Sequence, residues 1–148
     1  MKIILNADDF GIDIDRDFGI LYGVIKGYIS SVSVVVTNKI GLLRKIMIKL
    51  MRRKASIGIH INLTDEPLLN YRIKDLCDIE YNYNKMKYSF WKNAIFNTVN
   101  LKKIQKEIQS QIDKFQTSFK FFPEHIDGHN HCNIFNNQIS NLFEILPY

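Results

Sequence analysis

The sequence predicts an α/β fold in which the strands of a parallel sheet alternate with helices, and three observations support this prediction. Short apolar and β-branched segments, typical of buried strands, recur along the 148 residues. Between them lie longer segments whose apolar side chains recur every three or four residues, as on one side of a helix. The resulting order, βαβαβ and then αβα, is that of a parallel sheet with right-handed crossovers. A chain of this length with 46% hydrophobic residues suits a single domain, residues 1–148.

Four segments are predicted to be strands because they are short, apolar and rich in β-branched residues. They are residues 2–7 (KIILNA), 30–38 (SSVSVVVTN), 55–63 (ASIGIHINL) and the start of 123–131 (PEHIDGHNH). The third alternates most clearly, with isoleucine and leucine on one side and Gly58, His60 and Asn62 on the other. A strand flanked by helices is normally apolar on both sides, so His60 and Asn62 are candidates for a functional role.

Four segments are predicted to be helices, at residues 15–28, 39–54, 100–118 and 137–146. Helical spacing selects one apolar stripe on each of the first three. These stripes are Phe18, Leu21, Tyr22 and Ile25, then Leu43, Ile46, Met47, Leu50 and Met51, then Leu101, Ile104, Ile108, Ile112 and Phe115. Residues 64–90 are predicted to be irregular, and a loop of this length is usually functional or ordered by its own packing.

Charge and cysteine content narrow the range of partners. The net charge is +5, and seven Lys or Arg residues lie within residues 39–54. A basic amphipathic helix can bind nucleic acid or a membrane surface, but it is more often an outer helix with its lysines in water, so neither partner is expected. The first apolar run is too short for a signal peptide, and no stretch approaches the roughly 18 apolar residues of a membrane span. The two cysteines, Cys77 and Cys132, give no disulfide framework, and we expect a soluble, cytoplasmic protein.

Carboxylates and histidines gather where the predicted strands end. Asp8 and Asp9 follow the first strand, and like charges this close require a cation, a proton or solvent between them. A helix cap for one aspartate and water for the other would also meet that requirement. Near the last predicted strand, an extended backbone would send a run of alternate residues to one side: His125, Asp127, His129 and His131. Because ligand sites of parallel α/β folds lie at the carboxyl ends of the strands, these groups predict a metal centre at that rim.

Three motifs carry a resemblance to a known family. NADDFG (6–11), GIHINLT (58–64) and HIDGHNHCNIF (125–135) resemble the signatures of the YdjC-like carbohydrate deacetylases, in the same order and spacing. The resemblance implies a partial or distorted (β/α) barrel of the polysaccharide-deacetylase type. It also implies the hydrolysis of N-acetyl groups on oligosaccharides that contain N-acetylglucosamine, with one divalent metal ion, Mg²⁺ or Zn²⁺. Where the family often has a further histidine, this chain has Asn133.

The resemblance also implies roles for individual residues. It makes Asp9, His60 and His129 the metal ligands and Asp8 the general base, which answers the charge problem of the aspartate pair. The residues expected to contact the substrate are Asn62, Asp127 and His131. The family commonly reaches about 250 residues, the size of a full barrel. The expectations are therefore a domain incomplete at its C-terminus, weak activity, and self-association through an exposed sheet edge.

Two other functions and two local interpretations stay open at this point. A metal- or sugar-binding remnant without activity would keep the same ligands, and a metal-dependent phosphoesterase would use the same residue types. Cys132 is either a fourth ligand or nucleophile, or an inert buried thiol, and alternation favours the buried thiol. A group of aromatic residues could stack on sugar rings or simply pack the loop to the domain: Tyr71, Tyr81, Tyr83, Tyr88, Phe90 and Trp91.

Overall fold

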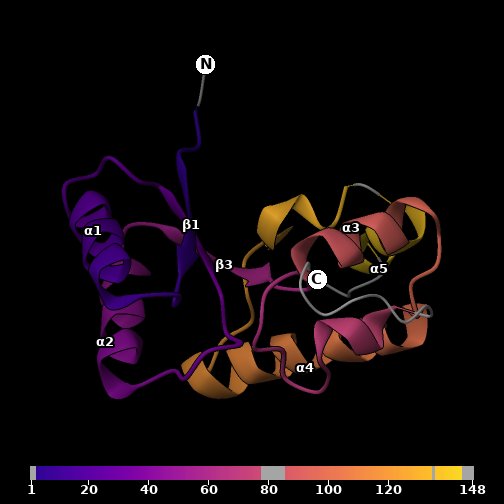
Figure 1. Cartoon of the computed structure of the whole chain (residues 1–148). Coiled ribbons are helices and arrows are strands. Elements are labelled where there is room, and N and C mark those ends of the chain that lie inside the picture. Colours follow the sequence, from indigo (N-terminus) through magenta and orange to yellow (C-terminus); the bar gives the residue numbers. More distant parts are fainter. Residues whose placement is uncertain (1–2, 78–85, 135, 145–148) are drawn as a thin grey trace. The chain divides into compact units, whose positions relative to one another are not determined.

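The computed structural model describes residues 3–77, 86–134 and 136–144 (Figure 1). The chain divides into two compact units. The first contains Met1–His60 and Ile112–Asp127, and the second contains Ile61–Gln111 and Gly128–Tyr148.

The first unit contains the sheet that the sequence predicts. Its strands are β1 (Asn6–Phe10), β2 (Ser31–Val34), β3 (Ser56–Ile61) and β4 (Ile126–Gly128). They lie in the order β1-β2-β3-β4, and both β1 with β2 and β2 with β3 pair in parallel. The prediction of a parallel sheet alternating with helices is therefore confirmed. The first strand begins later than predicted, at Asn6, so that both aspartates lie inside it rather than after it.

The two faces of this sheet differ in polarity. Ser31 pairs with Ser56 and Ser33 with Gly58, so these residues and His60 share one face. The alternate positions form the other face and are fully buried apolar residues: Val32, Val34, Ile57 and Ile59. The strands therefore place a polar ladder on one side of the sheet and a hydrophobic core on the other.

Helix α1 (Ile14–Ile25) buries a different side from the one predicted. The predicted stripe is wrong, because Phe18, Tyr22 and Ile25 are at least half exposed. The buried positions are Asp17, Ile20, Gly23 and Val24. Gly23 permits a close approach on that side, since a Cβ there would lie 2.5 Å from the Cδ1 atom of Ile29.

Helix α2 (Leu42–Met51) follows the prediction in part. Met47 and Met51 are buried as expected, together with Ile48, while three other members of the predicted stripe are close to half exposed: Leu43, Ile46 and Leu50. The lysines Lys45 and Lys49 are exposed, as expected of an outer helix. In Figure 1, α1 and α2 lie beside each other.

The second unit is mainly helical. It contains η1 (Ile73–Leu76), α3 (Met86–Ile95), α5 (Asn137–Glu144), the 3₁₀ turn η3 (His129–His131) and residues 101–111 of α4 (Leu101–Phe119). The bounds of α4 and the burial of Ile104 and Ile108 confirm the predicted long helix. The segment predicted to be irregular instead carries η1 and the start of α3. No described helix is both long and apolar enough to cross a membrane.

One buried carboxylate orders the loop before η1. Glu107 of α4 is fully buried and accepts hydrogen bonds from the backbone N–H groups of Leu69 and Asn70, at 2.8 and 2.9 Å. The side-chain amide of Gln111 donates to the same carboxylate at 2.9 Å. Packing and hydrogen bonding within the unit therefore hold part of this long loop in place, as one of the two sequence interpretations proposed.

Candidate metal centre and active site

The aspartate pair lies at an irregularity of β1. Ala7 pairs with Val32 and Phe10 with Val34, so two residues, Asp8 and Asp9, stand where the partner strand has only Ser33. Such a bulge re-aims side chains that would otherwise alternate between the faces of a strand. Asp9 has a φ of 69°, in the left-handed region that residues other than glycine rarely adopt. The backbone is therefore irregular at the position where the two carboxylates must be kept apart.

Each aspartate has its own hydrogen-bond partner. The amide of Asn6 donates to Asp8 Oδ1 at 2.6 Å, and the guanidinium of Arg16 donates to Asp9 Oδ2 at 2.6 Å. Asp8 is exposed, and Asp9 is partly buried. The pair thus divides into one carboxylate that faces solvent and one that is oriented by an arginine.

His60 on β3 is buried between two carboxylates. Its Nδ1 atom lies 2.6 Å from Asp127 Oδ1, and its Nε2 atom lies 3.4 Å from Asp9 Oδ1. An ionised carboxylate can only accept a hydrogen bond, so the short contact assigns the ring proton to Nδ1. In the neutral ring, Nε2 then has its lone pair available as a metal ligand.

Asp127 on β4 holds this arrangement in place. Burial alone raises the pKa of the Asp127 carboxyl, but the hydrogen bond and charge of His60 act in the opposite direction. With the hydrogen bond from Ser33 and the charge of His125, they hold the pKa of Asp127 below its ordinary value. Asp127 therefore stays ionised and fixes the His60 ring. Its expected contact with substrate stays a prediction.

A network of hydrogen bonds continues across the polar face. Ser33 Oγ donates to Asp127 Oδ2 at 2.7 Å and accepts from the Asn6 amide at 2.9 Å. The His125 ring lies 3.1 Å from Ser33 Oγ through Nε2 and 3.3 Å from Ser56 Oγ through Nδ1. Sequence reasoning did not single out Asn6, Ser33 or Ser56. The alternation of serine and valine in β2 was the signal that would have found Ser33.

The residues present fit a divalent metal ion. Two ligands of a tetrahedral ion, each about 2.0–2.1 Å from it, lie roughly 3.4 Å apart. This matches the 3.4 Å between Asp9 Oδ1 and His60 Nε2. A ligand histidine whose other nitrogen donates to a carboxylate is the usual arrangement at such centres, and Asp127 supplies that carboxylate. An oxygen and an imidazole nitrogen together suit zinc and similar transition metals.

Asp8 and His60 also belong to a second set of potential metal ligands, together with Asp127. Asp8, His60 and Asp127 each offer one ligand atom within 4.8 Å of the others. The proton on His60 Nδ1 and the hydrogen bonds to Asp127 make this the weaker metal set. What the grouping does show is that a ligand atom of the exposed Asp8 lies within 4.8 Å of a ring nitrogen of His60.

In the second unit, His129 and Asn62 make local hydrogen bonds. His129 is buried, and its Nε2 atom lies 2.7 Å from Asp65 Oδ2. Asn62 Oδ1 accepts from the backbone N–H groups of Thr64 and Asp65, so it stabilises the turn that carries this aspartate. The role of His129 as third metal ligand and that of Asn62 in substrate binding stay predictions.

The expected one-sided row of histidines is wrong. The extended backbone ends at Gly128, and Asn130 and His131 both adopt positive φ values, of 52° and 56°. Alternation therefore does not extend past β4, and His131 is exposed on the turn η3. Its contact with substrate stays a prediction. Cys132 is buried and its thiol donates to the backbone oxygen of Ile61, which supports the inert thiol.

The structure describes only part of the predicted aromatic group. Phe90 is fully buried and makes an edge contact with Trp91, with ring centroids 6.1 Å apart, so these two rings pack within the second unit. Tyr81 and Tyr83 lie outside the described residues, as does the side chain of Tyr88.

The parallel sheet and the Asp–His–Asp arrangement on its polar face place the chain among the α/β proteins, with a candidate metal centre on that face. The chain belongs to the YdjC-like protein family, whose model matches residues 2–147. It is 31% identical over 146 residues to a carbohydrate deacetylase of Clostridium beijerinckii. The aligned region covers 99% of this chain and 55% of the relative. It is 28% identical over 133 residues to a chitooligosaccharide deacetylase of Yersinia pestis, covering 89% and 50%. The chain thus spans about half the length of these curated relatives.

A solved structure confirms the fold. An Enterococcus faecalis protein that has been assigned to cellobiose-phosphate cleavage superposes with a TM-score of 0.71 and 23% sequence identity. The match covers 94% of this chain and 52% of that protein. At this identity the likeness establishes the shared fold.

Proposed function

We propose that this protein is a metal-dependent carbohydrate deacetylase that hydrolyses the N-acetyl groups of oligosaccharides containing N-acetylglucosamine. The observation that carries the proposal is the position of His60, whose two ring nitrogens face Asp127 and Asp9 at 2.6 and 3.4 Å. The names of the two relatives, a carbohydrate deacetylase and a chitooligosaccharide deacetylase, support the same substrate class.

Asp9 and His60 would hold the ion, Mg²⁺ or Zn²⁺, with His129 proposed as a third ligand. When bound, a divalent metal polarises the amide carbonyl and lowers the pKa of a coordinated water. The chain's own residues prepare this centre: Arg16 orients Asp9 at 2.6 Å, and Asp127 fixes the ring of His60. The hydrogen bond to Asp127 keeps the proton on Nδ1, away from the nitrogen that would face the ion.

Asp8 is proposed as the general base. Its carboxylate is exposed, is held by Asn6 at 2.6 Å, and belongs to the group within 4.8 Å of His60. A carboxylate in that place can accept the proton of an attacking water, an effect typically worth about 10²–10⁴-fold in rate. The residues proposed to contact the sugar are Asn62, Asp127 and His131.

The test combines metal content with acetate release from chitooligosaccharides by the full chain. Asp8→Asn is expected to keep the metal and to reduce turnover by about 10²–10⁴-fold. His60→Ala is expected to lose both metal and turnover. Asp15→Asn, at an exposed position in the first turn of α1, is the matched control and should change neither.

Three results would contradict the proposal. The first is equal metal loss in Asp8→Asn and His60→Ala, because the base and the ligand would then have the same role. The second is release of phosphate from p-nitrophenyl phosphate without any acetate release, which would favour a metal-dependent phosphoesterase. The third is metal binding by the full chain without either product, which would identify a binding remnant.

A further inference from the structure

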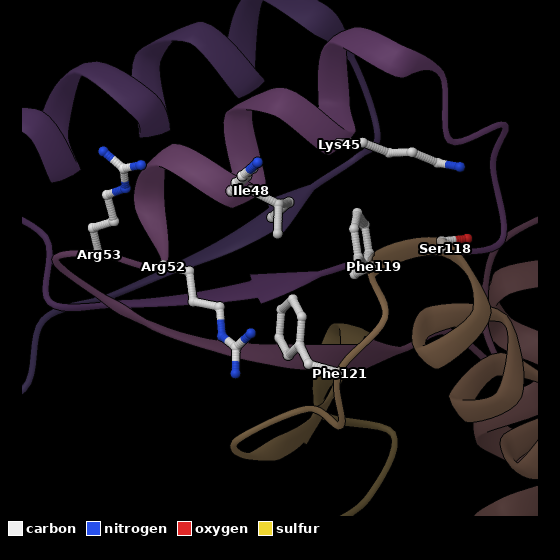
Figure 2. A pocket seen from close by; sticks show the side chains of 8 residues that line it. Lys45, Ile48, Arg52, Arg53, Ser118, Phe119 and Phe121 are labelled. Carbon is white, nitrogen blue, oxygen red and sulfur yellow. The ribbon is translucent and has the colours of Figure 1, made fainter.

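A basic groove lies in the first unit, between α2, the turn that follows it and the end of α4 (Figure 2). Its volume is about 550 Å³, within the range of sites that bind small molecules. The lining residues are Lys45, Ile48, Lys49, Arg52, Arg53, Ser118, Phe119 and Phe121. The groove shares no residue with the candidate metal centre.

Four of the eight lining residues carry positive charge, and none of these eight is acidic. The negative end of the helix dipole favours cations at the end of a helix, which accounts for Lys49, Arg52 and Arg53 at the end of α2. It does not account for Lys45, which lies near the beginning of α2, where a cation is unfavourable. The helix dipole therefore explains the cations at the end of α2, but it does not explain why all four cations line one groove.

Most of this charge is not neutralised by the described part of the protein. Elsewhere in the first unit, the largely buried Arg44 is neutralised by an ion pair, because it donates to the fully buried Asp17 at 2.7 Å. By contrast, Lys45, Lys49 and Arg53 form no ion pair with any residue that the structure describes. Like charges gathered around one groove repel one another, and a bound anion would relieve the repulsion.

The floor of the groove is apolar and aromatic. Ile48 is almost fully buried, and the rings of Phe119 and Phe121 lie between the two cationic ends in Figure 2, with Lys45 and Ser118 at one end and Arg52 and Arg53 at the other.

Neighbouring groups fix the two rings in place. Both make edge contacts with the buried ring of Phe115, at centroid distances of 4.9 and 5.3 Å. The guanidinium of Arg52 stacks on Phe121, 3.8 Å from the ring centroid, and lies 3.6 Å from Glu124. A fixed aromatic floor flanked by cations suits a ligand that combines a ring with a negative charge.

We propose that this groove binds a phosphorylated ring compound, a nucleoside phosphate or a sugar phosphate. The phosphate is held by the cations at the end of α2, among which Arg53 presents a fork of donors and Lys49 a single ammonium. The ring of the ligand lies against Phe119 and Phe121. An uncharged sugar would leave the cations unneutralised, and inorganic phosphate would leave the aromatic floor uncovered.

The test is isothermal titration of the full chain at about 0.15 M salt, where weak charge attraction is screened. The probes are ADP, glucose 6-phosphate, inorganic phosphate and glucose. We expect ADP or glucose 6-phosphate to bind at least tenfold more tightly than inorganic phosphate, and glucose not to bind. The double variant Lys49→Gln with Arg53→Gln should weaken that binding at least tenfold. The relative affinity of ADP and glucose 6-phosphate shows whether the ligand is a nucleoside phosphate or a sugar phosphate.

A matched control removes two exposed positive charges elsewhere, in Lys26→Gln with Lys102→Gln. This variant should bind the phosphates like the original protein, and circular dichroism should show that both double variants are folded. Equal weakening in the two double variants would overturn the proposal, as would equal affinity for inorganic phosphate and the ring compounds. Tighter binding of a single-stranded oligonucleotide than of ADP would also overturn it, in favour of nucleic acid.

Discussion

Replacing Gly58 by alanine tests the packing of the polar face of the sheet. A Cβ at this position would lie 2.3–2.5 Å from three atoms of the His125 ring, whereas ordinary carbon contacts are about 3.5–4.0 Å. The ring would have to move by roughly 1 Å, which would disturb its contacts with Ser33 and Ser56, 3.1 and 3.3 Å from its nitrogens. Gly58 is not among the described glycines with positive φ, so the obstacle is the ring and not the backbone.

The expected loss follows from overpacking. Forcing an extra methyl group into a filled site costs about 1–3 kcal/mol of unfolding free energy. For a chain of this length each kcal/mol lowers the melting temperature by about 2–4 °C, so a fall of about 2–12 °C is expected. Gly19→Ala is the matched control, because a Cβ there meets nothing within 4 Å and the residue lies inside α1. Alanine at that position should be neutral or stabilising, by up to about 1 kcal/mol.

The assay is denaturant unfolding followed by circular dichroism, carried out as a double-mutant cycle. In a His125→Ala background the ring is absent, and Gly58→Ala should become neutral or slightly stabilising. The coupling free energy between the two positions should then be at least about 1 kcal/mol. The same destabilisation by Gly58→Ala with and without the ring would refute the packing argument.

Three further predictions concern carboxylates that accept hydrogen bonds inside the protein, two of them fully buried. Asp17→Ala removes the partner of Arg44, which donates to Asp17 at 2.7 Å, and should lower the unfolding free energy by about 3–5 kcal/mol in denaturant titrations. Glu107→Ala leaves two backbone N–H groups without their acceptor, at about 1–3 kcal/mol each, and should increase hydrogen exchange at residues 69–70. Asp127→Asn should keep the fold and weaken metal binding about 10–100-fold by calorimetry, because His60 loses the carboxylate that orients it.

Alternation and long periodic patterns were sufficient to predict much of the fold. The isoleucines of β3 are buried and His60 lies on the polar face, as alternation requires. The same reading of β2 would have found Ser33, because serine and valine alternate there as well. The stripe of α4 is long enough for its period to be unambiguous, and Ile104 and Ile108 are buried as predicted.

The short outer helices show where an apolar pattern fails. On α1 the buried side contains Asp17 and Gly23, which no scale of hydrophobicity selects. Asp17 is buried because Arg44 and the backbone N–H of Gly11 satisfy its carboxylate, a tertiary arrangement that local sequence does not contain. Apolar residues such as Phe18 are consequently exposed.

The candidate site was predictable in its residue types but not in its local geometry. Strand order brought Asp8, Asp9 and His60 together, yet the irregularity that separates the two aspartates arises from pairing with β2. The hydrogen bond between Asp127 and His60 was not predicted, because the two residues are 67 positions apart and no local sequence pattern connects them. The positive φ values of Asn130 and His131 similarly break an alternation that the sequence alone would continue past Gly128.

The most direct measurement is Co²⁺ or Zn²⁺ binding to the full chain and to the variants Asp9→Asn and His60→Ala, with His131→Ala as the histidine control. One equivalent of metal should bind to the original protein, and visible absorption of bound Co²⁺ should report an imidazole ligand. Both ligand variants should lose at least tenfold in affinity, while His131→Ala should bind like the original protein. Unchanged affinity in Asp9→Asn and His60→Ala would contradict a metal centre on this face of the sheet.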